Sequence, residues 1–264
     1  MRHGSPIRAL GLLVPTALLA LVGCTDGGAP EGPPSPDDAP DYSSAALWLP
    51  FDEAVAADDG SEEFPAGDDA PYSGVVVQAN GGGVEQVEGA DGRGRALQFP
   101  GVCADDTGCP MALVEVAPDP ALAPGSEPFS WGASVRLSPS ETTDGSNVVQ
   151  QGRFASEGGQ WKLQVDGDEG LPSCRVRGDA GALVVTSTVS VADDVWHRVV
   201  CHRDDEGVSV AVDGEVTRES GPSGALASSE PIRVGSPGVN DGDDQFSGAI
   251  DDVFLELGSS ARVE

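Results

Sequence analysis

Residues 129–137 read Phe-Ser-Trp-Gly-Ala-Ser-Val-Arg-Leu, and apolar residues alternate with small or polar ones along this stretch. Successive side chains of a β-strand point to opposite faces, so the order predicts a strand that buries Phe129, Trp131 and their alternate neighbours on one face. An amphipathic helix would instead repeat apolar residues three or four positions apart. The stretch therefore predicts a β-strand with one face in a hydrophobic core.

The same two-residue period recurs on both sides of this stretch. Residues 161–165 and 208–212 alternate in this way, and each segment ends at an Asp-Gly turn signal. Further strand candidates are residues 112–116, 183–188, 195–201 and 232–234. The 36 Gly and 21 Pro residues disfavour long helices. So many short strand candidates predict an all-β fold, a sandwich of two packed antiparallel sheets.

The N-terminus has the pattern of an export signal. Two arginines precede Ala9–Val22, a mostly apolar run that is too short to span a bilayer comfortably. The run ends in Leu-Val-Gly-Cys at positions 21–24, which resembles the lipobox of bacterial lipoproteins. We therefore expect residues 1–23 to be a lipoprotein signal peptide and Cys24 to carry the lipid. The alternative is an ordinary secretory signal followed by an incidental cysteine.

The residues after Cys24 divide into a tether and a domain. Residues 24–43 are rich in Pro, Gly and Asp, a composition that buries too little apolar surface to fold. Residues 44–258 remain as one sandwich domain of ordinary length. No later segment is apolar enough to cross a membrane, so the lipid on Cys24 is the expected membrane contact. The expected location is the outer, extracytoplasmic face of the cell membrane.

The charge of the chain is strongly one-sided. It has 44 acidic residues against 14 basic ones, for a formal net charge of −30. Such a surface repels nucleic acid and anionic lipid headgroups, so neither is an expected partner. Acidic loops can also hold calcium, although a solvated acidic face is the commoner reason for such a composition.

Four cysteines remain besides Cys24. An even number of cysteines in an exported protein indicates disulfides, and four cysteines permit three pairings. We expect one bridge between Cys103 and Cys109, which would close a tight acidic loop. The other would join Cys174 to Cys201 and so link two strand candidates. A zinc site is the alternative, but no two of these cysteines have the short spacing of metal ligands.

Several motifs together resemble laminin-G-like domains of the concanavalin A-like lectin/glucanase superfamily. They are Trp-His-Arg-Val at 196–199, Val-Asp-Gly at 212–214, Phe-Ser-Gly-Ala-Ile-Asp-Asp-Val at 246–253, and the segments Leu47–Glu53 and Gly94–Phe99. The resemblance implies a jelly-roll sandwich of two curved antiparallel sheets over residues 44–258. The superfamily contains lectins, adhesion modules and glycosidases, so the resemblance alone implies no reaction.

The sequence offers little support for catalysis. Glycosidases use two carboxylates, and the glucanases of this superfamily carry them as Glu-x-Asp-x-x-Glu, a spacing that the chain lacks. No Gly-x-Ser-x-Gly elbow occurs. His197 and His202 have opposite parity on one strand candidate and cannot bind the same metal ion. We therefore expect no catalytic residue, and a glycosidase-like enzyme of the same superfamily is the alternative.

Calcium is the one cofactor that the resemblance suggests. Related jelly rolls hold a calcium ion where the first and last strands meet, and the matching positions here are Asp52 or Glu53 and Asp251. The acidic loop Asn240–Asp244 is a second candidate. The alternative is that the protein has no cofactor, Asp251 caps a bulge, and the loop is simply soluble.

The aromatic residues do not indicate an exposed sugar-stacking surface. Trp131, Trp161 and Trp196 lie in the apolar phase of their strand candidates, and Trp48 lies between two leucines. All four are therefore expected in the core. The expected function is a membrane-anchored, non-catalytic binding or adhesion module. Its ligand is expected to be a glycan or an extracellular or envelope protein.

Overall fold

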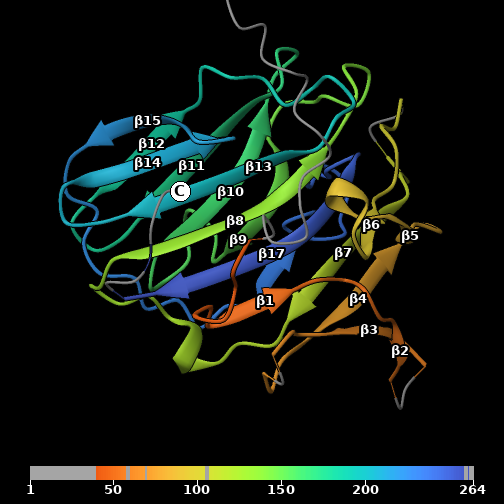
Figure 1. Cartoon of the computed structure of the whole chain (residues 1–264), viewed down its shortest axis with the longest axis horizontal. Helices are drawn as coiled ribbons and strands as arrows, with labels where there is room; N and C mark the ends of the chain where they lie inside the picture. Colours follow the sequence, from red (N-terminus) through yellow and green to blue (C-terminus); the bar gives the residue numbers. More distant parts are fainter. Residues whose placement is uncertain (1–39, 58–59, 69, 105–106, 259–260, 262–264) are drawn as a thin grey trace, which may run out of the picture. The chain divides into compact units, whose positions relative to one another are not determined.

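The computed structural model describes residues 40–261, except for residues 58–59, 69, 105–106 and 259–260 (Figure 1). Residues Pro40–Glu264 form one compact unit. The predicted signal peptide, the lipid-bearing Cys24 and most of the predicted tether lie outside the described residues. Within the described part, no helix has the length and apolar character needed to cross a membrane.

The described part of the chain folds into two antiparallel sheets. The first has eight strands, in the order β15 (Glu215–Ser220), β14 (Gly207–Val212), β13 (His197–Arg203), β8 (Phe129–Arg136), β17 (Ala249–Leu257), β6 (Arg95–Gln98) and β5 (Glu85–Glu88), with β1 (Leu47–Leu49) paired to β17. The second has nine strands, in the order β12 (Ala182–Thr186), β11 (Leu171–Arg177), β10 (Gln160–Asp166), β9 (Ser146–Gln151), β16 (Ile232–Val234), β7 (Met111–Val116), β4 (Ser73–Ala79), β3 (Glu62–Pro65) and β2 (Val55–Ala56). Two short 3-10 helices, Ala90–Gly92 and Pro120–Leu122, lie in loops.

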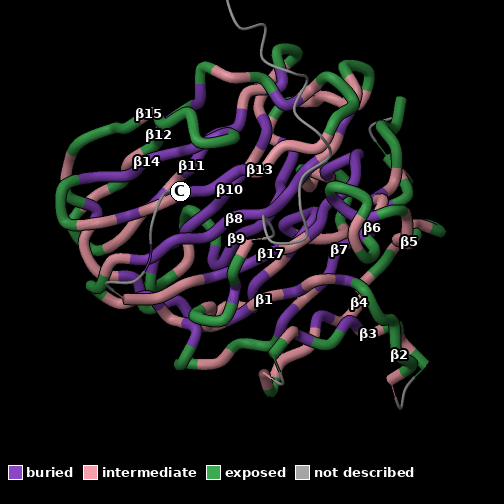
Figure 2. The backbone as a smooth tube through the Cα atoms, in the orientation of Figure 1, coloured by how far each residue is buried: buried purple, intermediate pink, exposed green. Residues whose placement is uncertain are grey.

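The core lies between the two sheets and is built from the alternate residues of their strands. In β8, Phe129 and Trp131 point inward, and the Trp131 ring lies 5.7 Å from that of Trp161 in β10. The buried stretches of the tube follow the central strands of both sheets (Figure 2). This arrangement confirms the prediction of an all-β jelly-roll sandwich, because each strand buries one face against the opposite sheet.

A second, smaller apolar cluster covers the outer face of the eight-stranded sheet. Tyr42 stacks on Trp48 with ring centroids 4.9 Å apart, and both pack near Phe254. The prediction that Trp48 lies in the main core is wrong, because β1 turns this ring to the outer face. Trp196 is also only half-buried, just before β13, where the Arg136 guanidinium lies 5.1 Å from its ring centroid. Trp131 and Trp161 are in the core as predicted.

Both predicted disulfides are present. Cys103 is bonded to Cys109, and Cys174 is bonded to Cys201. Cys174 lies in β11 of one sheet and Cys201 in β13 of the other, and both are fully buried. The second bridge therefore crosses the core and ties the two sheets together.

Candidate ligand-binding site

A row of polar side chains crosses the outer face of the nine-stranded sheet. In β10, Trp161 and Leu163 point into the core, so Lys162 between them points outward. Lys162 is paired in register with Arg175 of β11 on one side and with Gln150 of β9 on the other. The row continues through Arg233 of β16 and Glu115 of β7. Strand register alone brings these side chains together.

Five of the 14 basic residues of the chain lie on this face or in the loop beside it. They are Arg153, Lys162, Arg175, Arg177 and Arg233. Arg233 is paired with Glu115, whose Oε2 lies 2.9 Å from its Nε. The face is therefore unusually basic for a chain whose formal net charge is −30.

A pocket of about 320 Å³ lies over this row. Its lining includes Gln150, Arg153, Phe154, Lys162, Arg175 and Asp244. Lys162 is only 7% exposed although it points away from the core, because neighbouring loops cover it. Burial lowers the pKa of Lys162, whereas the nearby carboxylate of Asp244 raises it. The volume is within the range of small-molecule sites, which are roughly 300 to 1,000 Å³.

The rim of the pocket carries an exposed aromatic ring. Phe154 is 54% exposed and lies in the Gly-rich segment 152–159 between β9 and β10. The guanidinium carbons of Arg175 and Arg177 lie 5.8 and 5.2 Å from its ring centroid. Phe154 was not among the residues predicted from the sequence. Its position as the one aromatic residue of a glycine-rich loop was the available signal.

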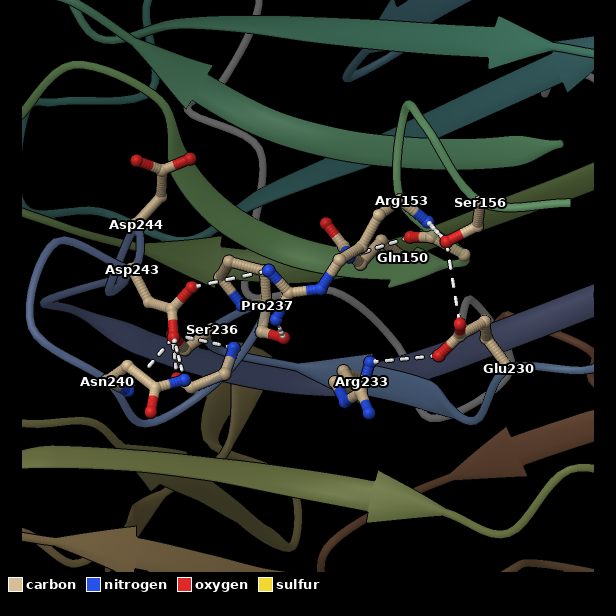
Figure 3. A network of polar contacts seen from close by, with 12 residues as sticks. Gln150, Arg153, Ser156, Glu230, Arg233, Ser236, Pro237, Asn240, Asp243 and Asp244 are labelled. Carbon is tan, nitrogen blue, oxygen red and sulfur yellow. Dashed lines mark hydrogen bonds and ion pairs between the residues drawn. The ribbon is translucent and has the colours of Figure 1, made fainter.

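A network of polar contacts holds the loops around the pocket (Figure 3). Arg153 donates a hydrogen bond of 2.7 Å to the Pro237 carbonyl and lies 3.6 Å from an Asp243 oxygen. Glu230 lies 3.7 Å from Arg233 on the other side of the same network. These contacts fix the loop before β10 against the loop after β16.

The acidic loop Asn240–Asp244 lines both this pocket and a second pocket of about 400 Å³. The Cys103–Cys109 disulfide lines the second pocket as well. The carboxylates of the loop have different partners. Asp243 accepts a hydrogen bond from the Asn240 backbone, and Asp244 lies 3.5 Å from the Lys162 ammonium. The loop therefore orders the rim of the basic pocket, while its proposed calcium role stays a prediction.

The other predicted calcium position lies where the chain after β1 meets β17. Asp251 is buried, and its two oxygens accept hydrogen bonds of 2.8 Å from the backbone of Ala90 and of Asp252. Asp52 is exposed and accepts a 2.7 Å hydrogen bond from the backbone of Arg95. Burial first, and then the charge of Asp252, raise the pKa of Asp251 to about 7.

These residues fit a calcium ion in part. Among the described residues, no group of three or more His, Cys, Asp or Glu side chains lies close enough to hold a metal ion. An ion beside Asp52 and Asp251 would therefore take its other ligands from backbone carbonyls and water, as calcium commonly does. A cation there would also favour the charged form of Asp251, which burial and then the charge of Asp252 disfavour.

His197 and His202 serve separate parts of the eight-stranded sheet. His197 lies between Asp213 and Asp193, with nitrogen–oxygen distances of 2.7 and 2.9 Å. His202 contacts the Ser130 hydroxyl at 2.9 Å on the outer face. Neither histidine lines the basic pocket. The Trp-His and Val-Asp-Gly motifs therefore meet through His197 and Asp213 and hold β13 to the turn that follows β14.

Comparison with solved structures finds the same fold. Domain 4 of AbnA, an extracellular GH43 arabinanase from Geobacillus stearothermophilus solved with arabinotriose, matches with a TM-score of 0.56 at 14% identity, over 81% of this chain and 93% of that domain. The binding domain of botulinum neurotoxin DC in complex with SialylT matches with a TM-score of 0.53 at 10% identity, over 81% of this chain and 48% of that one.

Trypanosoma rangeli sialidase in complex with 2,3-difluoro-KDN matches with a TM-score of 0.55 at 18% identity, over 89% of this chain and 34% of the sialidase chain. This chain thus spans about half of the neurotoxin chain and a third of the sialidase chain. At these identities the likeness shows the fold alone. No curated protein matches the sequence.

A family model described as the concanavalin A-like lectin/glucanases superfamily matches residues 114–255, more than half of the 264 residues. The match begins in β7, ends in β17 and includes every strand that forms the basic pocket. The chain therefore belongs to the concanavalin A-like lectin/glucanases superfamily.

Proposed function

We propose that this protein is a non-catalytic binding module that holds a carbohydrate in the pocket over β9, β10 and β11. The observation that carries the proposal is the exposed ring of Phe154 beside a floor of polar side chains. A sugar presents apolar C–H groups on one face and hydroxyls around its edge, so an aromatic ring and several hydrogen-bonding groups together suit it.

Similar structures support a carbohydrate as the ligand. The arabinanase domain was solved with arabinotriose, and the neurotoxin binding domain with SialylT. Among the described residues, Tyr42 and Trp48 pack on the eight-stranded sheet and do not line the pocket. A protein partner for the same face is the competing outcome of the binding test below.

The contacts around the pocket support binding without catalysis. A glycosidase needs one carboxylic acid to give up a proton and a second carboxylate across the sugar. The two carboxylates that line this pocket, Asp243 and Asp244, are adjacent in one loop and lie beside the cations Arg153 and Lys162. Incubation of the purified protein with a polysaccharide panel tests this directly, and release of reducing sugar would contradict the proposal.

The binding test compares one rim variant with a matched control. Phe154→Ala removes the exposed ring, and we expect affinity for a bound oligosaccharide to fall about tenfold, because such stacking contributes on the order of 1 to 1.5 kcal/mol. Val216→Ala shortens another exposed side chain, on β15 of the other sheet, and should leave affinity unchanged. A glycan array without binding, together with a protein captured specifically from envelope extract, would contradict a carbohydrate ligand.

We further propose that a lipid on Cys24 displays the domain on the outer face of the cell membrane. The sequence supports this through the apolar run that ends at Cys24. Metabolic labelling with an alkyne fatty acid should label the wild-type protein and not Cys24→Ser. Equal labelling of both, or recovery of the unlabelled protein from the cytosol, would contradict the anchor.

We also propose a structural calcium ion beside Asp52 and Asp251, with no role in the chemistry of the pocket. Calcium binding to the folded state should raise the Tm at pH 8 by several degrees over a sample in EDTA. Asp251→Asn should remove this response, whereas Asp205→Asn, in an exposed turn, should keep it. An unchanged Tm at millimolar calcium would contradict the site.

A further inference from the structure

The basic pocket has a charge pattern that the fold does not require. Three cations, Arg153, Lys162 and Arg175, line it, and Lys162 is the one lysine of the chain. With 44 acidic residues in the chain, each of these three cations could have a carboxylate partner. Arg153 and Lys162 have one, but Arg175 forms no ion pair with any described residue.

Lys162 and Arg175 are direct cross-strand neighbours in β10 and β11. Like charges directly opposite each other destabilise a sheet, because their side chains start only about 5 Å apart. Burial has the largest effect on Lys162 and lowers its pKa, the carboxylates of Asp244 and Asp166 raise it, and the charge of Arg175 makes a smaller contribution that lowers it. An anion bound between the two side chains would remove this repulsion.

Arg175 is also without an acidic partner. It forms no ion pair with any other described residue, and its Nε atom is buried without a hydrogen bond. Buried donors are normally satisfied, so an unpaired one beside a pocket indicates a group that the ligand supplies. Its guanidinium is held instead against the ring of Phe154, at 5.8 Å from the centroid.

The remaining ion pairs at this rim are loose. Lys162 lies 3.5 Å from Asp244, and Arg153 lies 3.6 Å from Asp243. Direct charge-assisted hydrogen bonds are shorter, roughly 2.7 to 2.9 Å. The Asp244 side chain is 46% exposed, so it can turn toward solvent when another anion takes its place beside Lys162. A ligand oxyanion therefore has room to replace these carboxylates as the partner of Lys162.

We propose that the pocket recognises an acidic sugar, whose carboxylate or sulfate lies between Arg175 and Lys162 while its ring packs against Phe154. This inference rests on the proposed carbohydrate-binding function and names the class of ligand. The planar guanidinium of Arg175 can donate two parallel hydrogen bonds to an oxyanion, and the ammonium of Lys162 adds a point charge. The net charge of −30 acts weakly on a small ligand at physiological salt, because screening limits it to about 8 Å.

The test is calorimetric titration of the purified full-length protein with matched pairs of small saccharides. The carboxylate pairs are trigalacturonate with its methyl ester, and sialyllactose with lactose. The sulfate pair is a chondroitin sulfate disaccharide with its unsulfated form. At least one acidic saccharide should bind about tenfold more tightly than its neutral partner, because the neutral partner lacks the charged group that accepts hydrogen bonds from Arg175 and Lys162. The pair that shows this difference in affinity identifies the preferred anion as a carboxylate or a sulfate.

Variants then assign the effect to the pocket. Arg175→Gln should reduce affinity for the acidic saccharide at least tenfold, and should reduce affinity for its neutral partner by a smaller factor. Arg175→Lys should restore part of the loss, because charge returns without the planar fork. Arg93→Gln makes the same change of net charge at a surface ion pair with Asp91 and should have less than about a twofold effect. A cooperative thermal transition in each variant confirms folding.

The outcomes separate the two proposals. Neutral saccharides that bind as tightly as acidic ones would overturn the acidic-sugar inference and leave carbohydrate binding intact. Binding of an acidic sugar that Arg175→Gln does not weaken would overturn the inference as well. If no saccharide binds, neutral or acidic, both the inference and the proposed function fail.

Discussion

His197 shows how a motif of the superfamily acts at a single residue. Burial alone would lower its pKa, but hydrogen bonds to Asp213 and Asp193, and the charges of both, outweigh burial and raise it. A folded-state pKa above that of the unfolded chain stabilises the fold below about pH 6.5, and this contribution is lost as the pH rises through the raised pKa.

We therefore expect His197→Gln to destabilise the protein most at about pH 6. The loss should be about 1 to 2 kcal/mol there, allowing for the solvent around the two exposed aspartates, and it should shrink by pH 9. Urea unfolding at a series of pH values measures it. A difference between variant and wild type that does not change with pH would contradict a charged His197.

The contribution of Asp251 to stability also falls as the pH rises, but over a lower pH range that begins near pH 4. Burial, with the nearby charges of Asp252 and Asp52, raises its pKa from 3.8 to about 7. Between these values the folded state holds a proton that the unfolded chain has lost, so stability falls as the pH rises from about 4 to about 7.

In EDTA, the ionisation of Asp251 should therefore lower the free energy of unfolding by at most about 4 kcal/mol between pH 4 and pH 8. This figure follows from about 1.36 kcal/mol for each unit by which the pKa is raised. Asp251→Asn keeps one of the two oxygens that accept backbone hydrogen bonds, so we expect it to be less stable than the wild type at pH 4. The difference in the free energy of unfolding between the variant and the wild type should shrink as the pH rises, because the variant does not ionise at this position. Unfolding curves at pH 4, 6 and 8 measure this difference. A gap between the two proteins that stays constant would mean that Asp251 titrates near its ordinary value.

Among the elements, β17 owes its acidic corner to a bulge. The register against β8 shifts between Asp251 and Phe254, and Asp252 has a φ of +47°. The extra residue lets Asp251 reach the backbone of Ala90 while Asp252 accepts a hydrogen bond from the Trp48 indole at 2.8 Å. A bulge at Asp251 was one of the alternatives for this segment, but strand alternation alone does not predict where Asp252 points.

Glycine is needed where this corner meets the chain before β6. Gly94 has a φ of +55°, and a Cβ atom there would lie 1.9 Å from an oxygen of Asp52. The Gly-x-Ala-Leu element of the sequence is therefore required by the backbone and by the approach of Asp52.

The two disulfides should differ in their contribution to stability. The Cys174–Cys201 bridge spans 27 positions and joins β11 to β13 across the core, whereas Cys103–Cys109 spans 6 positions in a loop. Loop-closure entropy predicts a loss of about 3 to 4 kcal/mol for the double Cys-to-Ala variant of the first and about 2 kcal/mol for that of the second. Equal midpoints in denaturant titrations of the two variants would contradict this ranking.

For the whole molecule, the net charge of −30 opposes compaction. Salt screens this repulsion, so the Tm should rise by several degrees between 10 mM and 500 mM NaCl. Sodium and potassium chloride should act alike, since general screening does not depend on the cation. A Tm that falls with salt would show that attractive ion pairs, such as Arg218 with Asp204, outweigh the repulsion.

The fold class was within reach of the sequence because it depends on local order. The alternation in residues 129–137 predicts which side chains of β8 are buried, and the structure buries Phe129, Trp131 and Val135 as expected. The disulfide pairs were predicted from the choice among three pairings. The ends of the strands and the orientation of Trp48 and Trp196 were not predicted, because these features depend on contacts with segments far away in the sequence.

The order of residues along the chain was enough to predict an all-β sandwich, its two disulfides and its resemblance to a lectin-like superfamily. That Lys162, Arg175 and Phe154 share one pocket follows only from the folded arrangement of the strands and loops. Alternation encodes which face of a strand is buried, but the register between strands comes from long-range pairing. Register sets Lys162 opposite Arg175, and loop packing leaves Phe154 exposed beside them. A binding site assembled in this way has no continuous signature along the chain.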